Sequence, residues 1–170
     1  RRSPNGTEQW IEPMSELPRP PYRADHVGSL LRPASVKDAR QRFAEKEIPA
    51  EELKAVEDEA IRGAVKLQQE AGLKVVTDGE IRRSFWHYDF MQDLVGFEFV
   101  EREAVTGIHF KGANTRPIFP TITGPVDFPA DHPMLEHFKF LASVADVTPK
   151  ISIPGPSCCH FRVAKEDIGY

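Results

Sequence analysis

The sequence contains little cysteine, no long apolar run and no excess of positive charge. Its only two cysteines, Cys158 and Cys159, are adjacent, and neighbouring Cα atoms about 3.8 Å apart do not suit disulfide geometry. No apolar run approaches the roughly 20 residues that cross a bilayer. The formal net charge of -4 argues against a nucleic-acid-binding surface. These absences predict a cytoplasmic protein with reduced thiols, and with neither a nucleic acid nor a membrane as its partner.

Glycine-rich motifs that bind phosphate are also missing. The sequence has no G-x-G-x-x-G and no P-loop, and it lacks the G-x-S-x-G pattern of serine hydrolases. Its 170 residues are enough for one domain with an apolar core. The length is nevertheless short for a closed (β/α)8 barrel, which usually needs about 250 residues and seldom fewer than 200.

The chain divides into a proline-rich start and an α/β remainder. Residues 1–21 contain five prolines and little apolar periodicity, which predicts a disordered leader. Residues 22–170 are expected to form one domain. Apolar patterns predict strands over 22–27, 73–77 and 149–153, and helices over 33–47, 49–71, 85–95 and 132–145. This order predicts about three βα units of a parallel sheet.

Two of these helices, and the region between them, support finer predictions. In the helix over 49–71, a stripe is expected to be buried, formed by Leu53, Val56, Ala60, Ala64, Leu67 and Ala71. In the helix over 132–145, the inward side is expected to hold Met134, Leu135, Phe138, Leu141 and Ala142. Between the two, the pattern predicts a β-rich excursion with strands at 97–100 and 108–111 and an edge strand or extended connection over 117–126.

Three polar loops that contain glycine follow the three predicted strands, at 26–29, 77–80 and 155–157. In parallel α/β folds, the loops beyond the carboxyl ends of the strands line the active site, so we expect all three to open on one face. Of the two carboxylates in these loops, Asp78 and Glu80, we single out Glu80. It is suited to bind an ammonium group or to act as a base, but a salt bridge to Arg82 or Arg83 is an equal alternative.

Other polar residues have two interpretations each. His26 is either a ligand or proton carrier, or a hydrogen-bonded structural residue. Arg82 and Arg83 either hold an anionic substrate tail or form a solvated pair. The Cys158-Cys159-His160 run resembles a zinc ligand set in composition, but structural zinc sites usually separate paired cysteines by two to four residues. Metal binding by this run stays open.

Several motifs together resemble the cobalamin-independent methionine synthase family. They are HVGSLLRP at 26–33, QEAGL at 69–73, TDGEIRR at 77–83, FW at 85–86, LVGF at 94–97 and KISIPGPS at 150–157. The resemblance covers approximately residues 22–162 and is closer to short, single-barrel members that are similar to the catalytic C-terminal domain. It implies a (β/α)8 TIM barrel, of which this chain would form the N-terminal part.

The resemblance also implies a reaction and a site. The reaction is methyl transfer from a 5-methyltetrahydrofolate-like donor to a homocysteine-like thiol, activated as a thiolate by zinc and without cobalamin. Val27, Gly28 and Ser29 would contact the amino-acid end of the thiol substrate, and Glu80 would accept its ammonium group. The family's zinc ligands include a His-x-Cys pair on later strands, and no such pair occurs in these 170 residues. Neither a catalytic residue nor a metal ligand is therefore assigned in this chain.

Three hypotheses follow for the role of the chain. In the first, it is an incomplete part of a methyltransferase of the methionine synthase type and cannot turn over alone. In the second, it is a non-catalytic, truncated barrel that associates with a partner or with itself through open sheet edges. In the third, the enzyme resembles the related uroporphyrinogen decarboxylases or performs another thiol-alkyl transfer.

Overall fold

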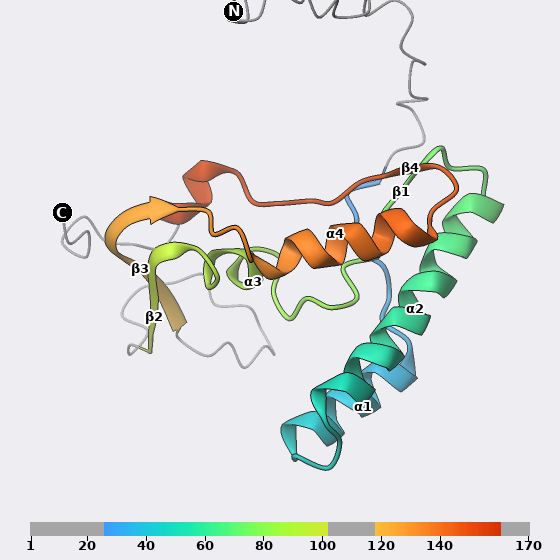
Figure 1. Cartoon of the computed structure of the whole chain (residues 1–170), viewed down its shortest axis with the longest axis horizontal. Helices are drawn as coiled ribbons and strands as arrows, with labels where there is room; N and C mark the ends of the chain where they lie inside the picture. The colour runs from blue at the N-terminus through green and yellow to red at the C-terminus, as the bar shows by residue number, and fades with distance from the viewer. Residues whose placement is uncertain (1–25, 102–117, 161–170) are drawn as a thin grey trace, which may run out of the picture.

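The computed structural model describes residues 26–101 and 118–160. It has mixed α/β structure, as predicted, with α1 and α2 packed side by side at one end, a β-hairpin at the other, and α4 between them (Figure 1). The elements are α1 (Ala34–Ala44), α2 (Ala50–Glu70), β1 (Val75–Val76), α3 (Tyr88–Met91), β2 (Val95–Glu101), β3 (Ile118–Asp127), α4 (Pro133–Val144), β4 (Thr148–Pro149) and the 3-10 helix η2 (Pro156–His160).

β1 and β4 pair in parallel, with Val75 opposite Thr148 and Val76 opposite Pro149. The pairing continues past β4 because the Lys150 amide donates to the Val76 carbonyl at 2.8 Å. Pro149 has no amide hydrogen to give to the ladder, which is one reason why β4 is shorter than the predicted strand. The predicted parallel βα unit is therefore confirmed in a shortened form.

The first predicted strand, over 22–27, is wrong for its described residues, since His26 and Val27 belong to no strand. Their carbonyl oxygens accept hydrogen bonds from the side chains of Lys150 and Ser152, at 2.5 and 2.6 Å. Because side chains take up these acceptors, the segment is held in place without a backbone ladder.

The β-rich excursion is an antiparallel hairpin of β2 and β3. Phe97 pairs with Ile122 and Phe99 with Pro120, and a register shift lies between Val95 and Phe97. The strand predicted at 97–100 and the extended segment at 117–126 are confirmed, while residues 108–111 are not among the described ones.

The helix predicted over 85–95 is correct only in its centre, since α3 covers just Tyr88–Met91. The Asp89 carboxylate accepts hydrogen bonds from the backbone amides of Ser84 and Phe85, at 2.7 and 2.6 Å. Because the Asp89 side chain takes the hydrogen bonds of these two amides, the residues before α3 form a turn and do not extend the helix. At the other end, Val95 already belongs to β2.

α2 matches the predicted helix in extent, but the predicted buried stripe is wrong by one position. The buried residues of α2 are Glu57, Ile61, Val65 and Gln68, whereas Leu67 and Ala71 are exposed. Gln68 is buried because it pairs with both backbone groups of Thr77, accepting from its amide and donating to its carbonyl at 2.9 Å each. An apolar pattern does not reveal a polar residue that is buried with its partners.

The main core lies where α1, α2, β1 and α4 meet. Its buried members are Val36, Ile61, Val65, Val76, Ile81 and Leu141. A second cluster fills the hairpin end, with Met91, Leu94, Phe97 and Ile122. In α4, Met134 and Leu141 are buried as predicted, whereas Leu135, Phe138 and Ala142 are exposed. Within the described ranges, no helix is both long and apolar enough to cross a membrane.

A buried ion network joins α1 and α2 to the loop after β1. Arg40 lies 3.1 Å from Glu57 Oε1, and Arg82 lies 3.5 Å from Glu57 Oε2 and also pairs with Asp58. Burial raises the pKa of Asp58, but hydrogen bonds from Lys54 and Arg82 outweigh burial and hold this pKa below its ordinary value. The network fixes the start of the loop against two helices.

Replacing Glu57 with alanine should destabilise the chain by roughly 3 kcal/mol, because Arg40 and Arg82 lose their shared buried carboxylate. The measurement is the free energy of unfolding in urea. Glu59→Ala, at an exposed position of the same helix, is the matched control and should change stability by less than about 0.5 kcal/mol. Equal losses for both variants would contradict a stabilising role for the network.

Candidate functional site

The first two predicted loops lie against each other. The Leu30 amide donates to the Gly79 carbonyl at 2.9 Å, and the Thr77 hydroxyl donates to the Gly28 carbonyl at 2.8 Å. One of these bonds is formed between two backbones, so the loops approach closely. This confirms that the polar segments at 26–29 and 77–80 meet on one side of β1.

Ser152 joins them from the segment after β4. Its hydroxyl donates to the Val27 carbonyl at 2.6 Å. A Cβ atom placed on Gly28 would lie 3.1 Å from Ser152 Oγ and 3.5 Å from Glu80 Oε1. Gly28 has a φ of +150°, so its lack of a side chain permits both its conformation and this close approach. The structure thus brings Gly28, Glu80 and Ser152 together.

Ser152 was not predicted as a site residue, since the sequence pointed to 155–157 in the third loop. Residues 156–160 instead form η2. The signal that could have identified Ser152 is the run Ile151-Ser152-Ile153, in which one polar side chain interrupts an apolar run shortly after the parallel strand β4.

Glu80 has a strained backbone and a buried carboxylate. Its φ is +52°, a left-handed value that costs a residue with a side chain about 1–3 kcal/mol, and it is only 7% exposed. Its amide donates to Asp78 Oδ1 at 3.0 Å, and its Oε1 lies 3.3 Å from Arg83 Nη1. The alternative of a salt bridge is therefore observed with Arg83. The strain favours a functional reason for having glutamate at this position.

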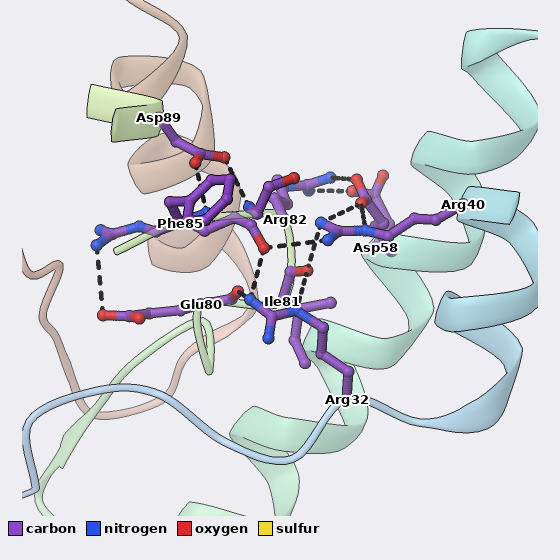
Figure 2. Close-up of polar contacts among 11 residues, drawn as sticks. Arg32, Arg40, Asp58, Glu80, Ile81, Arg82, Phe85 and Asp89 are labelled. Atoms are coloured by element: carbon purple, nitrogen blue, oxygen red, sulfur yellow. Dashed lines mark hydrogen bonds and ion pairs between the residues drawn. The ribbon is translucent and has the colours of Figure 1, made fainter. Parts of the chain in front are cut away.

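Two arginines of the α1 side hold the backbone of the loop that carries Glu80 (Figure 2). Arg32 Nη2 donates to the carbonyls of Glu80 and Arg83, at 2.9 and 2.5 Å, and Arg32 Nε donates to that of Ile81 at 3.3 Å. Arg40 donates to the carbonyls of Ile81 and Arg83, at 2.8 and 3.0 Å. The sequence offers no signal for these contacts, because the acceptors are backbone atoms.

Arg82 and Arg83 are adjacent but take part in separate networks. The prediction that they form a solvated pair is wrong, since their side chains are only 6% and 5% exposed. Arg82 pairs with Glu57 and Asp58, whereas Arg83 contacts Glu80 and two backbone carbonyls. Their terminal nitrogens are already engaged by these groups, which disfavours the alternative of an anionic substrate tail.

The structure places His26 in a structural role. Its Nε2 lies 2.7 Å from Gln68 Oε1, which favours the interpretation of a hydrogen-bonded structural residue. Of the remaining predicted positions, Val27 and Ser29 are exposed and Gly28 between them is buried. The turn 27–29 therefore presents two side chains outward next to Glu80.

Within 26–101 and 118–160, no three His, Cys, Asp or Glu side chains gather in a way that could hold a metal ion. The Cys158 thiol is half-buried and free, and packs against the second core cluster. The side chains of Cys159 and His160 are not described. The described residues thus do not fit the zinc site that the family implies, and metal binding by 158–160 stays open.

A cavity of about 870 Å³ lies on the other side of the loop, among α1, α2 and α4. It is lined by Arg82 and Phe140, among others, and does not include Glu80. Burial and the positive charge of Arg82 lower the pKa of the His137 imidazole in its wall. Because Arg82 is neutralised by its own carboxylate partners, we do not place the functional site here.

Gly79→Ala should destabilise the chain by about 1–2 kcal/mol, because φ at Gly79 is +68° and a Cβ there would lie 3.3 Å from Leu30 Cβ. Gly63→Ala is the opposing control. Gly63 is inside α2 with nothing within 4 Å of its added Cβ, so this variant should gain up to about 1 kcal/mol. Thermal unfolding of both variants measures the difference. A stabilised Gly79→Ala variant would contradict this loop geometry.

Comparison with known proteins gives consistent results. Residues 23–165 match the family described as cobalamin-independent synthase, catalytic domain. The chain is 48% identical over 145 residues to the uncharacterized protein YxjG of Bacillus subtilis, which covers 85% of this chain and 38% of that protein. It is 35% identical over 138 residues to a 5-methyltetrahydropteroyltriglutamate–homocysteine methyltransferase of Thermosynechococcus vestitus, covering 81% of this chain and 17% of that enzyme.

A solved structure from Listeria monocytogenes, crystallised as a candidate vitamin-B12-independent methionine synthase, superposes with a TM-score of 0.64. The two are 42% identical, and the match covers 82% of this chain and 38% of that one. The mixed α/β structure thus corresponds to part of a catalytic domain from a TIM-barrel family, and the chain spans about two fifths of the length of YxjG and of the Listeria protein. Since the match to the family extends over residues 23–165, the chain belongs to the cobalamin-independent methionine synthase family.

Proposed function

We propose that the chain supplies the amino-acid-binding part of a methyltransferase of the methionine synthase type. The reaction is transfer of a methyl group from a 5-methyltetrahydrofolate-like donor to the thiol of a homocysteine-like substrate, without cobalamin. One observation carries the proposal: the buried carboxylate of Glu80 and the backbone of Gly28 meet where two loops pack together. A relative that is 35% identical is named for methyl transfer to homocysteine, which favours this reaction over a decarboxylase-like one.

Glu80 is the group proposed to bind the substrate ammonium. Arg83 Nη1 lies 3.3 Å from its Oε1, and its second carboxylate oxygen is proposed to accept from the ligand. Burial increases the strength of such a charged hydrogen bond, since the surrounding dielectric is lower than that of water. Val27, Gly28 and Ser29 are proposed to contact the rest of the amino-acid end of the substrate, because they lie beside Glu80.

The reaction needs more than the described residues supply. The sulfur of the thiolate would form a bond to the methyl carbon as the bond from that carbon to the donor breaks. Zinc, when bound in a complete family enzyme, would stabilise the thiolate. Ligands for it are not found in the described part of this chain, so we assign no step here to zinc. We propose that residues 22–170 form about three βα units, the N-terminal part of a (β/α)8 barrel in a longer cytoplasmic enzyme.

The ammonium role of Glu80 can be measured with a pair of ligands and the 170-residue chain. L-homocysteine and 4-mercaptobutanoate differ only in the amino group, so the ratio of their dissociation constants isolates that group. We expect ligand-observed NMR to give about a tenfold preference for homocysteine, the size of one charge-assisted hydrogen bond. In Glu80→Gln, which removes the charge at almost constant volume, the preference should fall to about twofold or less.

Glu59→Gln is the matched control, because it removes a carboxylate from an exposed position of α2. This variant should keep the full preference for homocysteine. An unchanged preference in Glu80→Gln, or no preference in the unsubstituted chain, would overturn the proposed function.

A second candidate role, self-association, is favoured by exposed apolar side chains near the strand ends. Val27, Leu31 and Ile153 are 84%, 92% and 59% exposed. Side chains of this kind favour association with another surface. Size-exclusion chromatography with light scattering should then give a dimer of the 170-residue chain at micromolar concentration, and Leu31→Lys should shift it toward the monomer. A monomer at all concentrations would eliminate this role.

A further inference from the structure

We infer that Arg83 is a positioning residue for substrate recognition, which holds the Glu80 carboxylate and the Val27–Gly28 turn in one fixed geometry. This inference rests on the proposed function, because it assigns to Arg83 the orientation of the group that binds the ammonium. The proposed function concerns the groups that contact the substrate, whereas Arg83 is expected to orient those groups without touching the substrate itself.

The Arg83 side chain is buried and contacts three separate parts of the structure. Its Nη1 lies 3.3 Å from both Glu80 Oε1 and the Trp86 carbonyl oxygen. Its Nη2 donates to the Ser152 carbonyl and lies 4.0 Å from the sulfur of Met134 in α4. The guanidinium is therefore fixed by the loop after β1, by α4 and by the segment after β4.

These contacts leave Arg83 little capacity to bind a ligand carboxylate. Each terminal nitrogen carries two hydrogens, and each already faces two acceptors. Two of those acceptors are backbone carbonyls, so these contacts do not depend on the rotamer of another side chain. Arg83 is consequently a rigid support, and the Glu80 carboxylate takes its orientation from that support.

Ser152 extends the support to the other loop. Its carbonyl accepts from Arg83, and its hydroxyl donates to the Val27 carbonyl at 2.6 Å. One short chain of hydrogen bonds thus runs from Glu80 through Arg83 and Ser152 to the turn at 27–29. Because Glu80 and that turn are ordered before a ligand arrives, less conformational freedom is lost on binding.

Arg82 provides a matched control for Arg83. It is the neighbouring residue and is equally buried, and it also pairs with carboxylates, but these are Glu57 and Asp58 on α2. A substitution of either arginine removes a buried charge and an ion pair. A structural role alone therefore predicts similar consequences for both positions, whereas a positioning role predicts a difference in ligand selectivity.

The test compares Arg83→Met and Arg82→Met in the 170-residue chain, with L-homocysteine and 4-mercaptobutanoate as the two ligands. Methionine is close in length to the aliphatic part of arginine and removes the guanidinium group with its charge. We expect the tenfold preference for homocysteine to fall to about twofold in Arg83→Met and to stay near tenfold in Arg82→Met. Thermal unfolding, measured alongside, should show lower stability in both variants.

Arg83→Lys covers the case in which Arg83→Met does not fold. A lysine keeps the charge but reaches one acceptor in place of several, so an intermediate preference is expected. Full preference in a folded Arg83 variant would overturn the inference and leave the proposed function intact. Equal losses of preference in the Arg82 and Arg83 variants would also overturn it. If the unsubstituted chain shows no preference, the proposed function itself fails, and the inference fails with it.

Discussion

The structure depends on hydrogen bonds to the backbone carbonyl oxygens of one buried turn. Residues 80–83 leave the sheet edge in a conformation that forms neither strand nor helix, so their carbonyl oxygens need partners from elsewhere. Arg32 and Arg40 supply these partners from one side (Figure 2). The two arginines belong to the segment around α1, so the turn cannot form its full set of bonds until that helix has docked. The position of Glu80 is therefore a tertiary property and not a local one.

Two buried arginines of this turn connect it to two different parts of the molecule. Arg82 connects the turn to the helices through Glu57 and Asp58, and Arg83 connects it to Glu80 and to Ser152. Adjacent residues in an irregular turn can point to opposite sides, as they do in a strand. The packing of the helices and the proposed ligand site are thus linked through one short stretch of backbone, although the two arginines contact separate sets of side chains.

The sequence was informative where local pattern decides the structure and misleading where tertiary partners do. The extent of α2 follows from its apolar spacing, and Glu80 was singled out because it follows a short β-branched strand. The buried stripe of α2 was wrong because Gln68 is polar and yet paired with Thr77. Ser152, Arg32 and Arg40 act largely on backbone carbonyls, which every sequence possesses and no pattern marks.

The left-handed backbone of Glu80 has a consequence for the engineering of this protein. Glycine is the residue that this conformation favours, so a replacement there would relieve backbone strain but would also leave the buried Arg83 guanidinium without its carboxylate. Selection for thermal tolerance alone would therefore accept the loss of this carboxylate only together with a change at Arg83. Variants made more robust by screening should therefore be sequenced at both codons, because a stabilising change at one of the two positions depends on the residue at the other.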